Sequence, residues 1–176
     1  MPTFIPLLVL ALLCSSSSPS SSSLAPSSSS SSSRDCRANE TGIVVDTRAH
    51  QMVLCDDGKI ERTFAVALGI RGVGKQREGD NRTPLGRYGL GPPRASQHFH
   101  IFVPVQYPTP AQARMGFTGG AIGIHGPPRG WSFAELASLV AQDWTAGCIA
   151  VATDEDIEAV AAWIRKHGVK DVRLEV

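Results

Sequence analysis

Charge is missing from the start of this 176-residue sequence, because none of the first 33 residues is Lys, Arg, Asp or Glu. Over the whole chain the two signs nearly cancel: 17 basic and 16 acidic residues give a formal net charge of +1. Such a balance provides no basic surface for nucleic acid and no polybasic patch for a membrane. We therefore expect no nucleic-acid partner.

Long hydrophobic runs are also absent from the N-terminal region. The run FIPLLVLALL covers residues 4–13, whereas a membrane-spanning helix needs about 20 apolar residues. This length suits the apolar part of a secretory signal, so we expect export to the periplasm or cell envelope. Cys14 follows directly. Residues 1–14 are thus either a cleaved signal peptide or a lipoprotein signal, and a lipid on Cys14 would be the protein's sole membrane anchor.

The next stretch has almost no apolar side chains. Residues 15–33 are nearly all serine, a composition that buries no core. We interpret residues 15–40 as a flexible linker. Roughly 135 residues remain from residue 41 onward, enough for one self-sufficient core. Residues 41–176 are therefore predicted to form a single domain.

Cysteine is scarce, and one of the four cysteines has informative neighbours. Cys148 lies in the stretch DWTAGCIAV, after small residues and before the apolar run that begins at Ile149. Small residues favour a sharp turn, whose backbone N–H groups can form an oxyanion hole. A thiol with its usual pKa of about 8.5 is only a few per cent thiolate at neutral pH. A cysteine nucleophile therefore needs a base nearby.

His125 is the candidate base. It ends the short apolar run in AIGIHG, just as Cys148 precedes one, so both residues are predicted at strand ends that open to a cleft. An imidazole in contact with a thiol can remove its proton and activate it. The alternative interpretation is a buried structural thiol and an ordinary turn histidine.

The pattern IHG followed by TAGCIAV resembles the catalytic domain of the L,D-transpeptidases, the YkuD type. GDNRTPLGRYGLG, residues 79–91, resembles the family's Thr-Pro-x-Gly-x-Tyr/Phe segment, and residues 75–79 before it match a subgroup with Asp-Trp-Thr before the Gly-Cys. Residues 41–60 resemble the family's first β-hairpin. The resemblance covers residues 41–176 and implies a strand-rich α+β fold, a mixed β-sandwich with a few short helices.

The resemblance also implies a reaction. In such an enzyme Cys148 attacks a peptidoglycan stem peptide, forms a thioester acyl-enzyme, and transfers the acyl group to an amine, which cross-links the wall or attaches a lipoprotein to it. The carbonyl of Gly126 would orient His125, and N–H groups near Gly147 and Cys148 would stabilise the oxyanion. The alternative is a hydrolase of the same chemistry that cuts a wall peptide or a lipoprotein–wall bond. Neither reaction needs a cofactor or a metal.

Two positions depart from the family pattern. Ala146 stands where a second histidine is usual, so His125 is the one nearby base that the motifs offer. Ala150 stands where an arginine is common, so another basic residue must contact the carboxylates of the substrate. The candidates for this contact are Arg82, Arg87 and Arg129.

Two residues of the same motif have two interpretations each. Trp144 either shapes the wall of the cleft or is simply packed, as most tryptophans are. Thr145 either donates a hydrogen bond near the thiolate or satisfies the turn. Of the remaining cysteines, Cys36 and Cys55 are expected to pair in an oxidising compartment, the alternative being two independent thiols.

Hydrophobic periodicity and turn residues predict the scaffold. Strands are expected at 42–47, 51–55, 62–68, 87–90, 96–103 and 171–176, with helices over about 107–115, 132–141 and 153–167 and a polar, Gly-rich loop at 69–82. Alternation along 96–103 would place His98 and His100 on one strand face. That face is expected to lie near the cleft, and the alternative is a zinc site.

Three other classes of protein compete with this assignment. A secreted Cys–His hydrolase of ordinary proteins would use the same pair of residues on a different substrate. A wall-binding module without activity would not need Cys148. A zinc peptidase would depend on His98 and His100, and chelation would abolish its activity.

Overall fold

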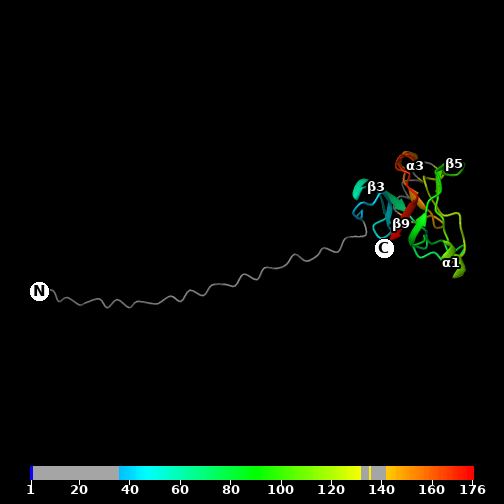
Figure 1. Ribbon diagram of the computed structural model, residues 1–176, viewed down its shortest axis with the longest axis horizontal. Helices are drawn as coiled ribbons and strands as arrows, with labels where there is room; N and C mark the ends of the chain where they lie inside the picture. Colours follow the sequence, from blue (N-terminus) through cyan, green and yellow to red (C-terminus); the bar gives the residue numbers. More distant parts are fainter. Residues whose placement is uncertain (2–35, 132–134, 136–141) are drawn as a thin grey trace. The chain divides into compact units, whose positions relative to one another are not determined.

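The computed structural model describes Met1, residues 36–131, Glu135 and residues 142–176 (Figure 1). Apart from Met1, these residues belong to one compact unit. The predicted signal and most of the predicted linker lie outside the described residues, as does nearly all of the helix expected at 132–141. None of the described helices has the length and apolar character of a membrane span.

Nine strands in the described part of the chain form one mixed sheet, in the order β4-β9-β1-β2-β3-β8-β7-β6-β5. The strands are β1 (Gly42–Asp46), β2 (Gln51–Asp56), β3 (Lys59–Ala67), β4 (Gly86–Gly89), β5 (Arg94–Ser96), β6 (His100–Pro104), β7 (Gly123–His125), β8 (Ile149–Val151) and β9 (Asp171–Glu175). The pairs β1–β9 and β7–β8 are parallel, and the other neighbouring strands run antiparallel. The strand-rich α+β class that the sequence predicted is confirmed.

Strand β3 joins the two halves of this sheet. Most of it pairs with β2, whereas its last residues, Val66 and Ala67, pair with β8. The hairpin between β2 and β3 turns at Asp57 and Gly58, which both have positive φ (48° and 78°), as a two-residue turn of this type requires. Because so short a turn lets pairing resume at once, β3 begins at Lys59 and not at residue 62 as predicted.

Helix α3 (Asp154–His167) covers part of the core near β6. Thr153 accepts the N–H of Asp156 and caps its start, and Gly168 in the left-handed conformation (φ 62°) ends it. Its buried residues are Ile157, Val160, Ala161, Trp163 and Ile164. The helix predicted at 153–167 is confirmed, except that Thr153 is its N-cap and Asp154 its first helical residue.

The single strand predicted at 96–103 is wrong. Strands β5 and β6 occupy its ends, and a turn separates them because Ser96 Oγ accepts the N–H groups of His98 and Phe99. His98 therefore lies in the turn while His100 starts β6, so the two imidazoles do not share a strand face. His100 Nε2 instead contacts Glu158 at 2.6 Å.

Two smaller features complete the scaffold. Helix α1 (Pro110–Arg114) begins later than predicted, because Thr109 is its N-cap and forms a reciprocal capping box with Gln112. A disulfide joins Cys36 to Cys55. It connects the segment before β1 to strand β2, in the half of the sheet away from β7 and β8.

Candidate active site

Strands β7 and β8 bring His125 and Cys148 to one face of the sheet. They pair in parallel, with Ile124 opposite Ile149 and His125 opposite Ala150. Extending this register by one residue places Cys148 opposite Gly123. Since side chains two residues apart on a strand share a face, His125 and Cys148 lie on the same face of adjacent strands, offset by two residues.

The Cys148 thiol is half-buried and donates a weak hydrogen bond to the carbonyl of Ala121 (Sγ to O, 3.6 Å). Burial raises the pKa of this thiol above its usual value, while the Gly123 N–H and the Lys75 ammonium act in the opposite direction. Burial is the largest of these effects. The resting group is therefore a neutral thiol that a base must deprotonate.

The His125 ring is fixed in one tautomer. Its Nδ1 lies 2.7 Å from the carbonyl oxygen of Gly126, and because a carbonyl only accepts, Nδ1 carries the proton. In the neutral ring Nε2 is then the basic nitrogen. The ring is almost fully buried, stacks on Phe99 at 3.9 Å between centroids and meets the edge of Trp144 at 5.8 Å.

We expect an activity profile with an acid limb below the ordinary histidine pKa of about 6.5. Burial lowers the pKa of His125, and the Gly126 carbonyl raises it by less. A lowered pKa keeps Nε2 unprotonated, and so basic, to a lower pH. Measurement of kcat/KM against pH reports this pKa in the free enzyme. An acid limb centred above pH 6.5 would contradict this assignment of the base.

The turn before Cys148 is held by Thr145. Its Oγ1 accepts the Gly147 N–H (3.0 Å) and donates to the Cys148 carbonyl (2.8 Å). The one hydroxyl proton is thus used inside the turn and is not available to the thiolate. This favours the interpretation in which Thr145 satisfies the turn. The Gly147 N–H is likewise engaged. Gly147 has φ of 125°, so its contribution is the shape of the turn.

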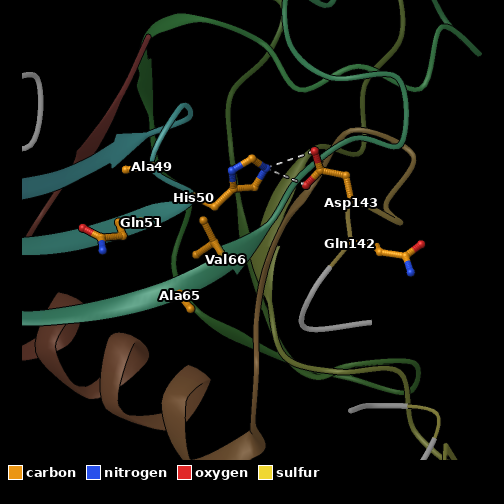
Figure 2. Close-up of a pocket in the computed structure, with 7 residues that line it drawn as sticks. All are labelled: Ala49, His50, Gln51, Ala65, Val66, Gln142 and Asp143. Carbon is orange, nitrogen blue, oxygen red and sulfur yellow. Dashed lines mark hydrogen bonds and ion pairs between the residues drawn. The ribbon is translucent and has the colours of Figure 1, made fainter. Parts of the chain in front are cut away.

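Asp143 anchors the same segment to the end of β3. Its Oδ1 accepts the Leu68 N–H (2.8 Å), and both of its oxygens lie 3.1 Å from His50 Nε2 (Figure 2). Thr145 continues this attachment, because its N–H donates to the Leu68 carbonyl and its own carbonyl accepts the Ile70 N–H. A cavity of about 270 Å³ borders the His50–Asp143 pair. No sequence pattern indicates that a histidine of the β1–β2 turn contacts this motif.

Replacing Asp143 with alanine is expected to lower the free energy of unfolding by about 1–3 kcal/mol, because the buried Leu68 N–H loses its acceptor. Urea denaturation measures this change. His50→Ala is the matched control, since it removes only the partly exposed contact with Asp143, which contributes at most about 1 kcal/mol. Equal destabilisation by the two substitutions would show that Asp143 does not anchor the turn.

A family model of the L,D-transpeptidase catalytic domain, YkuD, matches residues 40–172. The chain belongs to this family. No curated protein matches the chain. Among solved structures, the helical cell shape determining protein Pgp2 from Campylobacter jejuni is 26% identical with a TM-score of 0.58, over 76% of this chain and 46% of that one.

Two further structures share the YkuD fold. Bd1075 of Bdellovibrio bacteriovorus is 19% identical with a TM-score of 0.55, over 80% of this chain and 51% of that one. An L,D-transpeptidase from Stackebrandtia nassauensis is 12% identical with a TM-score of 0.50, over 80% and 58%. The chain thus spans only about half the length of these proteins, between 46% and 58%.

The three arginines proposed for substrate binding lie in different places in this YkuD domain. Arg82 is in the segment that packs behind the turn, with its carbonyl oxygen 2.5 Å from where a Cβ on Gly147 would lie, and its guanidinium donates to the Val73 carbonyl. Arg129 follows the His125 strand, and its Nη2 contacts His100 Nδ1 at 3.1 Å.

Arg87 lies on β4 and is paired with Asp171 of β9 at 2.9 Å. No contact in the described part of the chain connects it to Cys148 or His125. The contact of Arg82, Arg87 or Arg129 with substrate carboxylates stays a prediction.

An aromatic row lies beside His125. Trp144 contacts His125 on one side and Trp131 on the other, with ring centroids 5.8 Å apart in each case. Trp131 is exposed. Trp144 therefore packs between His125 and Trp131, and its role in shaping a substrate cleft stays a prediction. Phe99, which packs directly on His125, was not predicted, because alternation along 96–103 gave no reason to connect it to His125.

Proposed function

We propose that this domain is a peptidoglycan L,D-transpeptidase in which Cys148 is the nucleophile and His125 the general base. Membership of the YkuD family supports the class of reaction. The observation that carries the assignment of residues is the parallel register of β7 and β8, which places His125 and Cys148 on one face. The Gly126 carbonyl adds to it by leaving Nε2 as the basic nitrogen.

The reaction begins as Nε2 of His125 takes the thiol proton and Sγ attacks the carbonyl carbon of a stem peptide. The Cys148 N–H stabilises the developing oxyanion, since the Gly147 N–H is already bonded to Thr145. The C–N bond then breaks, and the leaving amine takes the proton from the imidazolium. The product of this half-reaction is a thioester on Cys148 and a free amine.

In the second half-reaction an amine of another stem peptide, or of a wall-attached lipoprotein, attacks the thioester. Nε2 takes the amine proton and returns it to the leaving thiolate, which restores the resting thiol. We propose the exported location that the N-terminal sequence predicts, because the wall lies outside the cytoplasm. The name of Pgp2, a helical cell shape determining protein, is in keeping with a role in cell shape.

The test is intact-mass analysis of the full chain incubated with defined muropeptides, with a Cys148→Ala chain as control. Products that join two stem peptides, absent from the control, would support transpeptidation. Shortened peptides without joined products would contradict transpeptidation and indicate hydrolysis by the same cysteine. If Cys148 gives no acyl adduct and no product appears with any muropeptide, the proposal fails altogether.

A further inference from the structure

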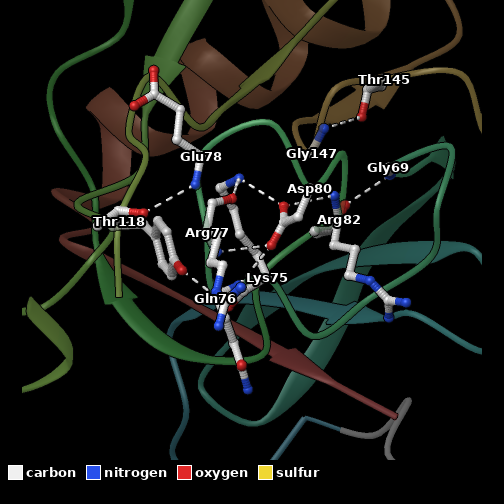
Figure 3. Close-up of polar contacts among 12 residues, drawn as sticks. Gly69, Lys75, Gln76, Arg77, Glu78, Asp80, Arg82, Thr118, Thr145 and Gly147 are labelled. Atoms are coloured by element: carbon white, nitrogen blue, oxygen red, sulfur yellow. Dashed lines mark hydrogen bonds and ion pairs between the residues drawn. The ribbon is translucent and has the colours of Figure 1, made fainter. Parts of the chain in front are cut away.

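Lys75 is a buried charge near the proposed nucleophile. Only 3% of its side chain is exposed, and its Nζ donates to Asp80 Oδ1 at 2.9 Å and to the Arg77 carbonyl at 3.0 Å (Figure 3). A buried lysine is costly unless it is paired and hydrogen-bonded. This lysine meets both conditions, so its ammonium has a fixed position in the fold.

Asp80 organises the loop that holds Lys75. Its two oxygens accept the N–H groups of Gln76, Arg77 and Arg82 in addition to the Lys75 ammonium. Burial opposes the charge of Asp80, but these four donors together hold its pKa far below the usual range. The Asp80 carboxylate is therefore ionised at neutral pH, opposite the Lys75 ammonium.

The same loop contacts the segment that precedes β7. The Thr118 N–H donates to the Gln76 carbonyl, and Thr118 Oγ1 accepts the Glu78 N–H (Figure 3). Lys75 Cε lies 3.3 Å from where a Cβ on Gly119 would be. Two residues further on, the Ala121 carbonyl accepts the Cys148 thiol. The lysine side chain thus packs against Gly119, two residues before the carbonyl that accepts the thiol.

The other end of the loop contacts the turn that presents Cys148. The Lys75 N–H donates to the Thr83 carbonyl, and Thr83 Oγ1 accepts the Gly69 N–H. The neighbouring Arg82 carbonyl packs against Gly147. One loop therefore fixes the charge of Lys75 relative to both the Ala121 backbone and the Cys148 turn.

We propose that Lys75 is a positioning residue whose buried ammonium, fixed by Asp80, stabilises the Cys148 thiolate as His125 removes the proton. This inference rests on the proposed function, because it assigns Lys75 a task in the same reaction. A charge that is already in place costs no reorganisation when the thiolate forms. It also offsets the burial that raises the pKa of Cys148.

The polar and charged groups around the sulfur differ in whether they favour or disfavour the Cys148 thiolate. Lys75 and the Gly123 N–H favour the thiolate. Asp80 neutralises part of the Lys75 charge, and His125 is neutral at rest because its pKa is lowered. Removing the lysine charge should therefore disfavour the thiolate, whereas removing the aspartate charge should not.

The experiment measures the rate at which iodoacetamide alkylates Cys148 as a function of pH, in the unprocessed full chain. Mass spectrometry of the Cys148 peptide gives the rate, and Cys14, outside the catalytic domain, serves as an internal reference in each sample. In Lys75→Met, alkylation at neutral pH should fall roughly threefold to tenfold, because an adjacent positive charge is lost. Lys75→Arg should retain a rate close to that of the unmodified chain.

Asp80→Asn separates a charge effect from a structural one. If Lys75 acts through its charge, alkylation of Cys148 in Asp80→Asn is as fast as in the unmodified chain or faster. If the ion pair only holds the loop, Asp80→Asn slows alkylation as much as Lys75→Met does, and the proposal is overturned. If Lys75→Met does not fold, the double variant Lys75→Met/Asp80→Asn replaces it, because it removes both charges and leaves no buried charge unpaired. Alkylation of Cys148 should again be slower in this variant than in the unmodified chain.

Alkylation does not require peptidoglycan, so the two proposals can fail separately. In one outcome, alkylation of Cys148 is slower in Lys75→Met, but the unmodified chain forms no muropeptide products. This outcome would contradict the proposed function and support the electrostatic role of Lys75. In the other outcome, the unmodified chain forms muropeptide products, and folded Lys75→Met is alkylated at the same rate as the unmodified chain. This outcome would contradict the role of Lys75 and leave the proposed function intact.

Discussion

Cys148→Ser is expected to reduce acyl transfer about a thousandfold or more, the scale of loss when a nucleophile is replaced. The substitution keeps the size and the hydrogen-bonding capacity of the side chain but replaces the thiol with a much weaker acid. His125 is placed to deprotonate a thiol whose pKa burial has already raised. A serine hydroxyl is a still weaker acid, so the same imidazole would not activate it. The rate is measured from the appearance of joined muropeptides.

The fold should not change in this variant. The contact of Cys148 Sγ with the Ala121 carbonyl is weak, and a hydroxyl can replace it. Thermal unfolding should therefore occur within a few degrees of the unmodified chain. Cys14→Ser is the matched control, because it makes the same chemical change outside residues 40–172, the part that the family model matches. Loss of activity in the control, or retained activity in Cys148→Ser, would contradict the role of Cys148.

Much of this site could be predicted because its residues are marked by short-range patterns. The small residues before Cys148, the apolar runs beside Cys148 and His125, and the Thr153 cap are local signals, and local signals determine turns, strands and helix ends. The family motif added the Gly126 carbonyl, which does contact His125 Nδ1.

The remaining features depend on contacts between residues far apart in the sequence. Phe99 reaches His125 because Ser96 turns the chain between β5 and β6. His50 meets Asp143 only because the β1–β2 turn lies beside the end of β3. Neither hydrophobic periodicity nor motif spacing in the sequence predicts such long-range contacts. Lys75 illustrates the same limit, because its sequence neighbours indicate an exposed loop while three-dimensional packing buries it.

Gly147→Ala is expected to lower the free energy of unfolding by about 2–4 kcal/mol and to remove nearly all activity. Two effects contribute. Gly147 has φ of 125°, a backbone conformation that alanine rarely adopts. An added Cβ would also lie 2.5 Å from the Arg82 carbonyl oxygen, which belongs to backbone that several hydrogen bonds hold in place. Relief of the clash must therefore move the turn, and with it the Cys148 sulfur.

Gly74→Ala separates these two effects. Gly74 also has positive φ (85°), but no atom lies within 4 Å of where its Cβ would be. This control carries the backbone strain alone, which costs about 1–2 kcal/mol, and should leave activity nearly unchanged. If the two variants unfold at the same urea concentration and transfer acyl groups equally well, the Arg82 backbone does not constrain the turn. A larger loss in Gly147→Ala would mean that close packing behind Cys148, and not glycine flexibility as such, sets the position of the nucleophile.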